Sequence, residues 1–200
     1  MQIQDHWLVG KNVYKYRSPN FSKDLDPKAF KPDTIVMHYT AGSTVEGAVC
    51  HLCDVEKEVS SHLVVSRDLR IFQLVPFNVP AWHSGVSEWK NRTSLNQYSI
   101  GIEIDNAGKL DFIKGKYLSW FEKEYPENEV LKLKHVNREQ EEYWHKYNKE
   151  QILLLEEISK ILIKKYGIKE LVGHDEISPY RKIDPGPAFP IKDFKKLICI

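Results

Sequence analysis

The sequence predicts an α/β fold in which a central mixed β-sheet is flanked by helices. Three observations support this class. Strand-like apolar segments alternate with helix-like segments along the 200 residues. Two of the strand-like segments follow one another closely enough to pair as a hairpin, and one long segment has the apolar stripe of an amphipathic helix. Strands separated by helices together with a hairpin are typical of a mixed sheet in an α/β sandwich.

The first buried strand is expected at residues 33–39, where most positions are apolar. It ends before Gly42, which is a natural break. Ser43 or Thr44 could then cap a helix that extends to about Val55, because hydroxyl side chains accept hydrogen bonds from the first free amides of a helix.

Residues 61–75 resemble a hairpin whose turn lies at 67–70, although this turn has no glycine. The segment 76–96 contains scattered Pro, Gly, Ser and Asn, so we expect a long surface loop, and long loops are often functional. Residues 98–105 alternate regularly: three isoleucines share one face, and Glu103 lies on the other.

Charge and aromatic residues dominate 109–147, which we expect to be a partly helical, mostly solvated insertion in the single domain formed by the whole chain. The stripe in 148–165 predicts an amphipathic helix that Gly167 ends. A short strand at 170–173 and a helix near 191–197 complete the expected fold.

Composition excludes some classes of function. The chain is 42% hydrophobic and 28% charged, with a net charge of +1, so it has no basic excess of the kind that nucleic-acid binders show. No apolar run is long enough for a transmembrane segment. Residues 1–15 are polar and broken by charge, unlike a signal peptide, so a cytoplasmic location is expected.

The three cysteines do not form a disulfide framework, because their number is small and odd. Cys50 and Cys53 form a C-x-x-C pair with His51 inside it. This pair could be a redox or metal site, or simply two small residues one turn apart on a helix. The second interpretation is favoured because no other cysteine pair completes a zinc site.

Five residues in three regions suggest a hydrolytic site. His38 lies in the first strand, and His174 directly follows the short strand at 170–173. Asp184 precedes Pro-Gly-Pro, and Lys182 lies two residues before it, so an extended chain presents an ammonium and a carboxylate on one side. Glu103 is a carboxylate on a rigid strand. Taken singly, each has an ordinary interpretation as a core histidine, a surface ion pair or a solvent-facing strand residue.

Together these residues meet the needs of a zinc hydrolase. Such a site takes three protein ligands and leaves a fourth position for water, and His38, His174 and Asp184 could supply the three. Glu103 could accept the proton of the water. Lys182 could stabilise the developing oxyanion.

The same regions resemble motifs of a known family. Its motifs are similar to Ile35–Thr40, Ser60–Val65, Ala81–Ser87 leading into Asn96–Glu103, and Gly173–His174 through Lys182–Pro187. The chain thereby resembles the type 2 N-acetylmuramoyl-L-alanine amidases, which include AmpD-like amidases, phage endolysins and peptidoglycan recognition proteins. The third stretch and the loop from histidine to aspartate are most similar to the AmpD-like branch.

The resemblance implies a mixed sheet with a zinc cleft on one side and one Zn²⁺ ion. It implies metal ligands at His38, His174 and Asp184, and catalytic roles for Glu103 and Lys182. Four further residues correspond to positions that line the substrate site: Trp82, His83, His62 and Trp89. His62 could instead be a packed, hydrogen-bonded histidine, and the tryptophans could be anchors of their loop. Some members have a tyrosine where this chain has Ser61, and Glu103 can fill the role of the base.

The expected activity is hydrolysis of the amide between N-acetylmuramic acid and L-alanine, in intact peptidoglycan or in soluble muropeptides. The alternative is a peptidoglycan-binding module without activity, which the full set of ligands disfavours. A zinc deaminase is rejected: residues 174–176 satisfy H-x-E, but no P-C-x-x-C follows. A lysin that is released to the wall through a separate pore is the alternative to a cytoplasmic recycling enzyme. The sequence does not indicate the oligomeric state.

Overall fold

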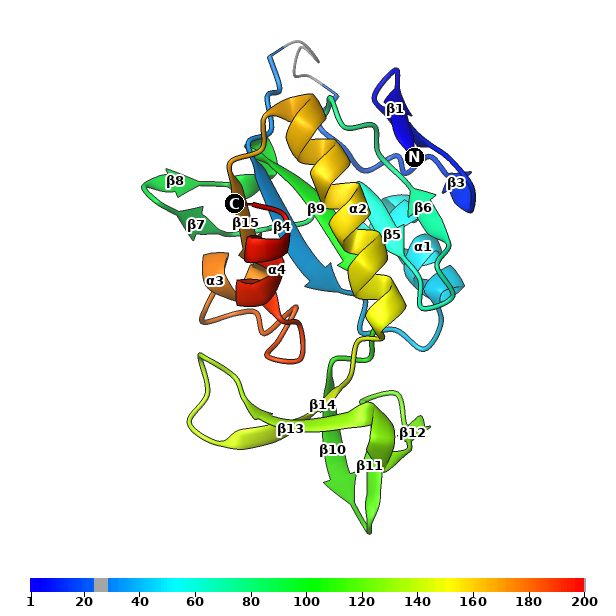
Figure 1. Ribbon diagram of the computed structural model, residues 1–200, viewed down its shortest axis with the longest axis vertical. Helices are drawn as coiled ribbons and strands as arrows, with labels where there is room; N and C mark the ends of the chain where they lie inside the picture. Colours follow the sequence, from blue (N-terminus) through cyan, green and yellow to red (C-terminus); the bar gives the residue numbers. More distant parts are fainter. Residues whose placement is uncertain (24–28, 200) are drawn as a thin grey trace.

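The computed structural model describes residues 1–23 and 29–199. Its centre is a six-stranded sheet with the strand order β15-β4-β9-β5-β6-β3 (Figure 1). In chain order the strands are β3 Val13–Lys15, β4 Thr34–Tyr39, β5 Leu63–Val65, β6 Ile71–Gln73, β9 Ser99–Ile104 and β15 Glu170–Gly173. The pairs β15–β4, β4–β9, β5–β9 and β3–β6 are parallel and β5–β6 is antiparallel, so the prediction of a mixed sheet is confirmed.

Helices cover both faces of this sheet. Alternate side chains of the β5–β6 hairpin point to opposite sides, so each face presents apolar residues against which a helix can pack. Leu63, Val65 and Ile71 belong to the larger core cluster, which includes the buried face of helix α2, Lys149–Tyr166. Val64 and Phe72 belong to a second cluster with helix α1, Val45–Cys53. The hairpin therefore separates two apolar layers. Two short helices, α3 His174–Ile177 and α4 Ile191–Leu197, follow β15.

The ends of the two longer helices follow from local chemistry. Thr44 accepts a hydrogen bond from the amide of Gly47 and begins α1. Asn148 forms a reciprocal capping box with Gln151 at the start of α2. Gly167 ends α2 with φ 68°, a left-handed conformation that glycine adopts without steric cost. The expected starts of both helices and the end of α2 at Gly167 are confirmed, whereas α1 ends at Cys53, slightly before the expected Val55.

The segment 76–96 differs from the expected surface loop. It contains the hairpin of β7 Glu88–Trp89 and β8 Arg92–Thr93, and the 3₁₀ helix η2, Leu95–Gln97, follows. Several of its side chains are buried, among them Phe77, Val79, Ala81 and Leu95. These residues fill spaces beside the central sheet, so the prediction of a mostly exposed loop is wrong.

The segment 109–147 forms a second sheet, with the order β12-β11-β10-β14-β13 (Figure 1, lower part). Its strands are β10 Lys109–Ile113, β11 Lys116–Leu118, β12 Glu124–Tyr125, β13 Val130–Lys134 and β14 Glu141–His145. The expectation of partial helix is wrong, since the helical structure here is limited to the 3₁₀ turn η3, Glu127–Glu129. Lys114 and Gly115 have positive φ and turn the chain between β10 and β11, which the high charge of the segment concealed.

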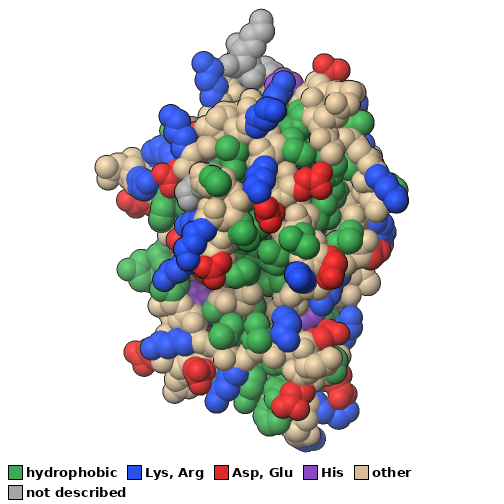
Figure 2. All heavy atoms as spheres, in the orientation of Figure 1, with side chains coloured by type: hydrophobic (Ala, Val, Ile, Leu, Met, Phe, Trp, Pro, Cys, Tyr) green, Lys and Arg blue, Asp and Glu red, His purple; other side chains and the backbone are tan. Residues whose placement is uncertain are grey.

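The remaining elements are the hairpin of β1 Gln2–Gln4 and β2 Trp7–Val9, and the 3₁₀ turn η1, Val55–Lys57. Within the described residues, no helix is sufficiently long and apolar to cross a membrane. Charged side chains of both signs are scattered over the face shown in Figure 2, with hydrophobic groups between them, as the net charge of +1 leads one to expect.

Candidate active site

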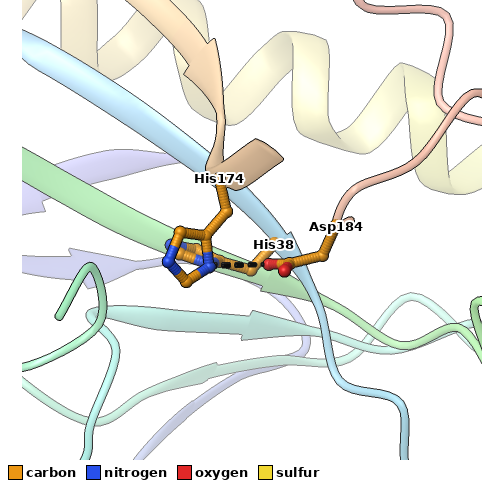
Figure 3. A group of neighbouring side chains, drawn as sticks. All are labelled: His38, His174 and Asp184. Carbon is orange, nitrogen blue, oxygen red and sulfur yellow. Dashed lines mark hydrogen bonds and ion pairs between the residues drawn. The ribbon is translucent and has the colours of Figure 1, made fainter. Parts of the chain in front are cut away.

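Three side chains expected to bind metal meet at the carboxyl ends of two neighbouring strands. His38 is near the end of β4, and His174 directly follows β15, which pairs with β4 in parallel. Asp184 reaches the same point from the loop after α3 (Figure 3). All three are buried, and their ligand atoms lie within 4.8 Å of one another. Within the described residues this is the one such group of three or more His, Cys, Asp or Glu side chains.

The ligand atoms form an almost equilateral triangle. Nδ1 of His38 lies 2.9 Å from Nδ1 of His174, and Oδ2 of Asp184 lies 3.0 Å and 2.9 Å from these two nitrogens. Tetrahedral zinc with bonds of about 2.0–2.1 Å separates its ligands by about 3.3 Å, slightly more than these edges. Two imidazoles and one carboxylate are also a donor set that zinc takes in hydrolases. The residues therefore fit a zinc ion with an open fourth position.

A chain of hydrogen bonds leaves Nδ1 of His38 without a proton. The Ser99 hydroxyl donates to the carbonyl of Leu95, so its oxygen accepts from Nε2 of His83 at 3.2 Å. Nδ1 of the neutral His83 ring then accepts from Nε2 of His38 at 3.0 Å. The lone pair of His38 Nδ1 consequently faces His174 and Asp184. Partners of this kind orient metal-binding histidines.

His174 is oriented in the same way. Its Nε2 lies 3.1 Å from the carbonyl oxygen of Ser84, to which it donates. Nη2 of Arg181 is also 3.3 Å from His174 Nε2, but it does not need to donate to that nitrogen. The two hydrogens of Nη2 have closer acceptors in the carbonyl oxygens of Ser84 and Val86, at 2.7 and 3.0 Å. His174 Nδ1 therefore also presents a lone pair. Lone pairs of two imidazoles and a carboxylate repel one another unless a cation lies between them.

Backbone contacts position the loop that carries Asp184. The amide of Asp175 donates to the carbonyl of Asp184 at 2.7 Å, and the hydroxyl of Tyr147 donates to the carbonyl of Pro185 at 2.8 Å. From the second sheet, His135 Nε2 contacts the Asp175 carboxylate at 2.8 Å. Gly186 packs against the ring of Trp144, and a side chain at this position would overlap it. The second sheet thus supports the loop from behind.

The electrostatics favour the charge states that metal binding requires. Burial, together with the nearby His174, lowers the pKa of His38 to about 4, so the ring is neutral at pH 7. Burial alone would raise the pKa of Asp184, but hydrogen bonds that a protonated Nδ1 of His174 or His38 donates to the carboxylate hold that pKa well below its usual range. Neutral imidazole and ionised carboxylate are the forms that bind a metal ion.

Glu103 lies directly beside the candidate metal ligands. It is on β9, in register with His38 on β4. Its Oε2 atom is buried and has no hydrogen-bond partner within the described residues. Burial first, and then the Asp184 carboxylate, raise the pKa of Glu103 well above its usual range, while Lys182 acts in the opposite direction. A carboxyl group with a free oxygen and a raised pKa suits proton transfer near neutral pH.

A cavity of about 690 Å³ joins the predicted catalytic residues. Glu103, Lys182, Trp82 and the metal ligands all contribute to its lining. These residues form one wall of the cavity. The other wall is formed by α1 and the residues that lead into it, including Ala41, Gly42, Ser43, Thr44, Gly47, Ala48 and His51. We call this cavity the cleft. Within the described residues, no hydrogen bond or ion pair engages the Lys182 ammonium, which is therefore available to a ligand.

The four residues expected to line the substrate site have different surroundings. Trp82 lines the cleft, and its Nε1 donates to Ser22 Oγ at 3.1 Å. His83 touches the cleft but is 9% exposed, and both its nitrogens are engaged behind His38. Its ring lies so close to Gly101 that a Cβ there would be 2.4 Å from it. His83 is thus placed to orient His38 more than to contact substrate.

Two of these expectations require correction. His62 is completely buried between the rings of Phe30 and Phe77; its Nδ1 accepts from the amide of Gly101, and its Nε2 donates to the carbonyl of Val79. Trp89 lines a separate hollow beside β7 and α3 and packs in the apolar cluster of Val36 and Leu95. Neither residue lines the cleft. His62 follows the packed, hydrogen-bonded interpretation, and Trp89 anchors its loop.

The C-x-x-C pair lies on α1, where Cys50 is exposed and Cys53 is partly buried, and both thiols are free. Neither belongs to the group of candidate metal ligands in the described residues. The interpretation as two residues on one helix therefore holds. Sequence reasoning missed Trp120 and Arg181, which also line the cleft. Arg181 neighbours a recognised motif residue, whereas Trp120 lies in a segment without any motif.

The buried His62 predicts a pH dependence of stability. Burial lowers its pKa to about 4, against about 6.5 in the unfolded chain, so the folded state favours the neutral ring. The neutral ring contributes its full share to the free energy of unfolding above about pH 6.5. This contribution is lost as the pH falls from about 6.5 through about 4, and the loss reaches about 3 kcal/mol for this one group. Denaturant unfolding between pH 7.5 and 4 measures it. His62→Gln should show a shallower decline, and an equal decline in both proteins would contradict this role.

The site and the fold define a candidate metal-dependent hydrolase, and comparisons with known proteins identify its family. Residues 28–187 match the family model described as N-acetylmuramoyl-L-alanine amidase. The amidase AmiD of Escherichia coli K12 is 36% identical over 165 residues, which are 78% of this chain and 49% of AmiD. The chain belongs to the N-acetylmuramoyl-L-alanine amidase family, and the expected enzyme class is confirmed.

Two further similarities extend this result. The 1,6-anhydro-N-acetylmuramyl-L-alanine amidase AmpD of Escherichia coli K12 is 27% identical, over 99% of this chain and 97% of AmpD. The structure of Escherichia coli AmiD, in complex with anhydro-N-acetylmuramic acid-L-Ala-D-γ-Glu-L-Lys, superposes with a TM-score of 0.64 at 31% identity, over 88% of this chain and 60% of that one. The chain therefore spans about half the length of AmiD but nearly all of AmpD. The expected fold class is confirmed.

Proposed function

We propose that this protein hydrolyses the amide between N-acetylmuramic acid and L-alanine in muropeptides, with one zinc ion held by His38, His174 and Asp184. The observation that carries the proposal is the triangle of three ligand atoms beside the unpartnered carboxyl oxygen of Glu103. Similarity to AmpD along nearly the whole chain favours soluble anhydro-muropeptides over intact wall as the substrate. The residues 109–147 would be an insertion in a single amidase domain.

Zinc, when bound, supplies a Lewis acid that lowers the pKa of water and polarises the target carbonyl. Glu103 accepts a proton from the attacking water, since its buried Oε2 has no competing partner among the residues that the structure describes. The same carboxyl then gives the proton to the amine of L-alanine as the C–N bond breaks. The Lys182 ammonium lines the same cleft and stabilises the negative charge on the carbonyl oxygen.

A module that binds muropeptides without cutting them would not need this arrangement. It would retain the cleft but would have no need for a free, buried carboxyl beside three metal ligands. In this chain the ligands, Glu103 and Lys182 line one cavity, which supports catalysis over binding alone.

The direct test is incubation of the zinc-loaded protein with anhydro-N-acetylmuramoyl-L-Ala-D-γ-Glu-L-Lys and, separately, with intact peptidoglycan. Mass spectrometry should show free stem peptide that begins with L-alanine, formed faster from the soluble substrate. Binding of both substrates without release of peptide would favour the recognition module. Faster release from intact peptidoglycan would favour a wall-degrading lysin.

Replacing Lys182 by methionine should lower kcat by roughly 10²–10³-fold, because the methionine keeps most of the side-chain volume but removes the charge from the oxyanion. The effect should fall mainly on kcat rather than on KM, and zinc content should stay the same. Steady-state kinetics with metal analysis measure both quantities. Lys192→Met is a matched control on α4, outside the residues that line the cleft. An unchanged kcat in Lys182→Met would remove this lysine from the mechanism.

A further inference from the structure

Trp120 is a large exposed side chain that is nevertheless fixed in place. It lies between β11 and β12 and is 73% exposed. Its Nε1 donates to the carbonyl of Ala41 at 2.7 Å. The ring of Phe121 contacts it edge to face, with the centroids 5.6 Å apart. These two contacts hold one edge of the indole and leave apolar surface open to solvent, so a ligand that covers it gains hydrophobic free energy.

This indole belongs to the cleft although it comes from the second sheet. Ala41, to which it is bonded, lies three residues after the metal ligand His38 and just before α1. Trp120 and Phe121 line the same cavity as Glu103 and Lys182. The insertion therefore brings an aromatic wall to the site, in addition to supporting the loop of Asp184.

The two walls of the cleft differ in chemistry. The wall beside Trp120 consists mainly of small uncharged residues between Ala41 and Ala48, followed by His51 and Leu52; Glu46 does not line the cavity. The wall made by the loop after α3 carries the cations Arg181 and Lys182. The substrate has two corresponding parts. The muramoyl ring is uncharged and has apolar C–H faces that pack on aromatic rings, whereas the stem peptide carries carboxylates that basic side chains attract.

We propose that Trp120 forms a subsite for the N-acetylmuramoyl ring, with the stem peptide lying toward Arg181 and Lys182. This inference rests on the proposed amidase function and adds a residue that determines the choice of substrate. The subsite contributes to binding and takes no part in the chemical step, because the indole has no group that can transfer a proton to the amide.

Kinetics with two substrates test the subsite. One is anhydro-N-acetylmuramoyl-L-Ala-D-γ-Glu-L-Lys, and the other replaces the sugar by a D-lactoyl group on the same tripeptide. Trp120→Ala should raise KM for the first by about tenfold, which corresponds to about 1.4 kcal/mol, with little change in kcat. For the lactoyl peptide KM should change less than twofold. Trp120→Phe should lie between, because it retains a ring but loses the bond to Ala41.

Two controls separate the subsite from folding and from the amidase function. Val136→Ala changes another exposed apolar residue of the second sheet, outside the cleft, and should leave both substrates unaffected. Calorimetric titration of N-acetylmuramoyl methylamide into zinc-loaded Glu103→Gln, with and without Trp120→Ala, measures sugar binding without turnover and should show the same tenfold loss. Equal effects of Trp120→Ala on both substrates, or no effect on either, would overturn the subsite. Hydrolysis by the native protein in the same assay would still support the amidase function. If no substrate is hydrolysed, the amidase function fails, and the titration still decides for or against the subsite.

Discussion

Replacement of Glu103 by glutamine is expected to lower kcat by roughly 10²–10⁴-fold, the range that general acid–base catalysis contributes. The glutamine has nearly the same shape but cannot accept the proton of the attacking water. Its position on β9 opposite His38 lies within the sheet, so the geometry of the metal ligands should be preserved. Steady-state kinetics with the soluble muropeptide measure the change.

Zinc content and substrate affinity must be measured alongside, because the interpretation depends on both. Glu103→Gln should retain a full complement of zinc and bind the muropeptide with little change in affinity. Glu88→Gln is a matched control, since Glu88 is an exposed carboxylate on β7 that does not line the cleft. If Glu103→Gln retains more than half of the native kcat, another group must serve as the base.

Replacement of Asp184 by alanine is expected to remove both zinc binding and detectable hydrolysis. The carboxylate is 8% exposed and lies within 3.0 Å of both histidine nitrogens, and the group of candidate ligands in the described residues has no fourth member that could replace it. Loss of one of three protein ligands leaves two neutral imidazoles, which are too few for a stable zinc site. Metal analysis after dialysis, together with the rate of muropeptide hydrolysis, measures the effect.

Cys50→Ser is a useful comparison for this variant, because Cys50 belongs to the C-x-x-C motif, which also suggested metal binding. It should keep zinc and activity at native levels, since its thiol is exposed on α1 and belongs to no ligand group in the described residues. Zinc that is retained by Asp184→Ala but lost from Cys50→Ser would place the metal at the cysteine pair instead.

Much of the central sheet could be predicted from the sequence because local signals and tertiary structure agree there. The apolar run of β4, the alternation of β9 and the caps of α2 each have one good structural solution. The candidate metal ligands could be proposed from the sequence because two histidines and an aspartate in strand ends and a proline-rich loop resemble a known motif, and the structure brings the three together. Their mutual distances could not, since the register of β15, β4 and β9 is decided by long-range pairing.

The second sheet was missed for a physical reason. Its strands mix charged, aliphatic and aromatic residues on a largely solvated surface, so the apolar periodicity that distinguishes strands from helices is weak. The burial of His62 and the separate hollow of Trp89 depend on the packing of 76–96 against the sheet, which no local pattern reveals. Trp120 was missed for the same reason as the sheet that carries it.

A zinc titration of the metal-free protein, with binding and activity recorded on the same samples, tests whether one zinc ion at this site is responsible for hydrolysis. Hydrolysis of the muropeptide should rise in proportion to bound zinc and reach its maximum at one equivalent, and Asp184→Ala should show neither response. Full activity of protein that contains no metal, or a maximum reached only after a second equivalent is bound, would contradict a single catalytic zinc ion held by His38, His174 and Asp184.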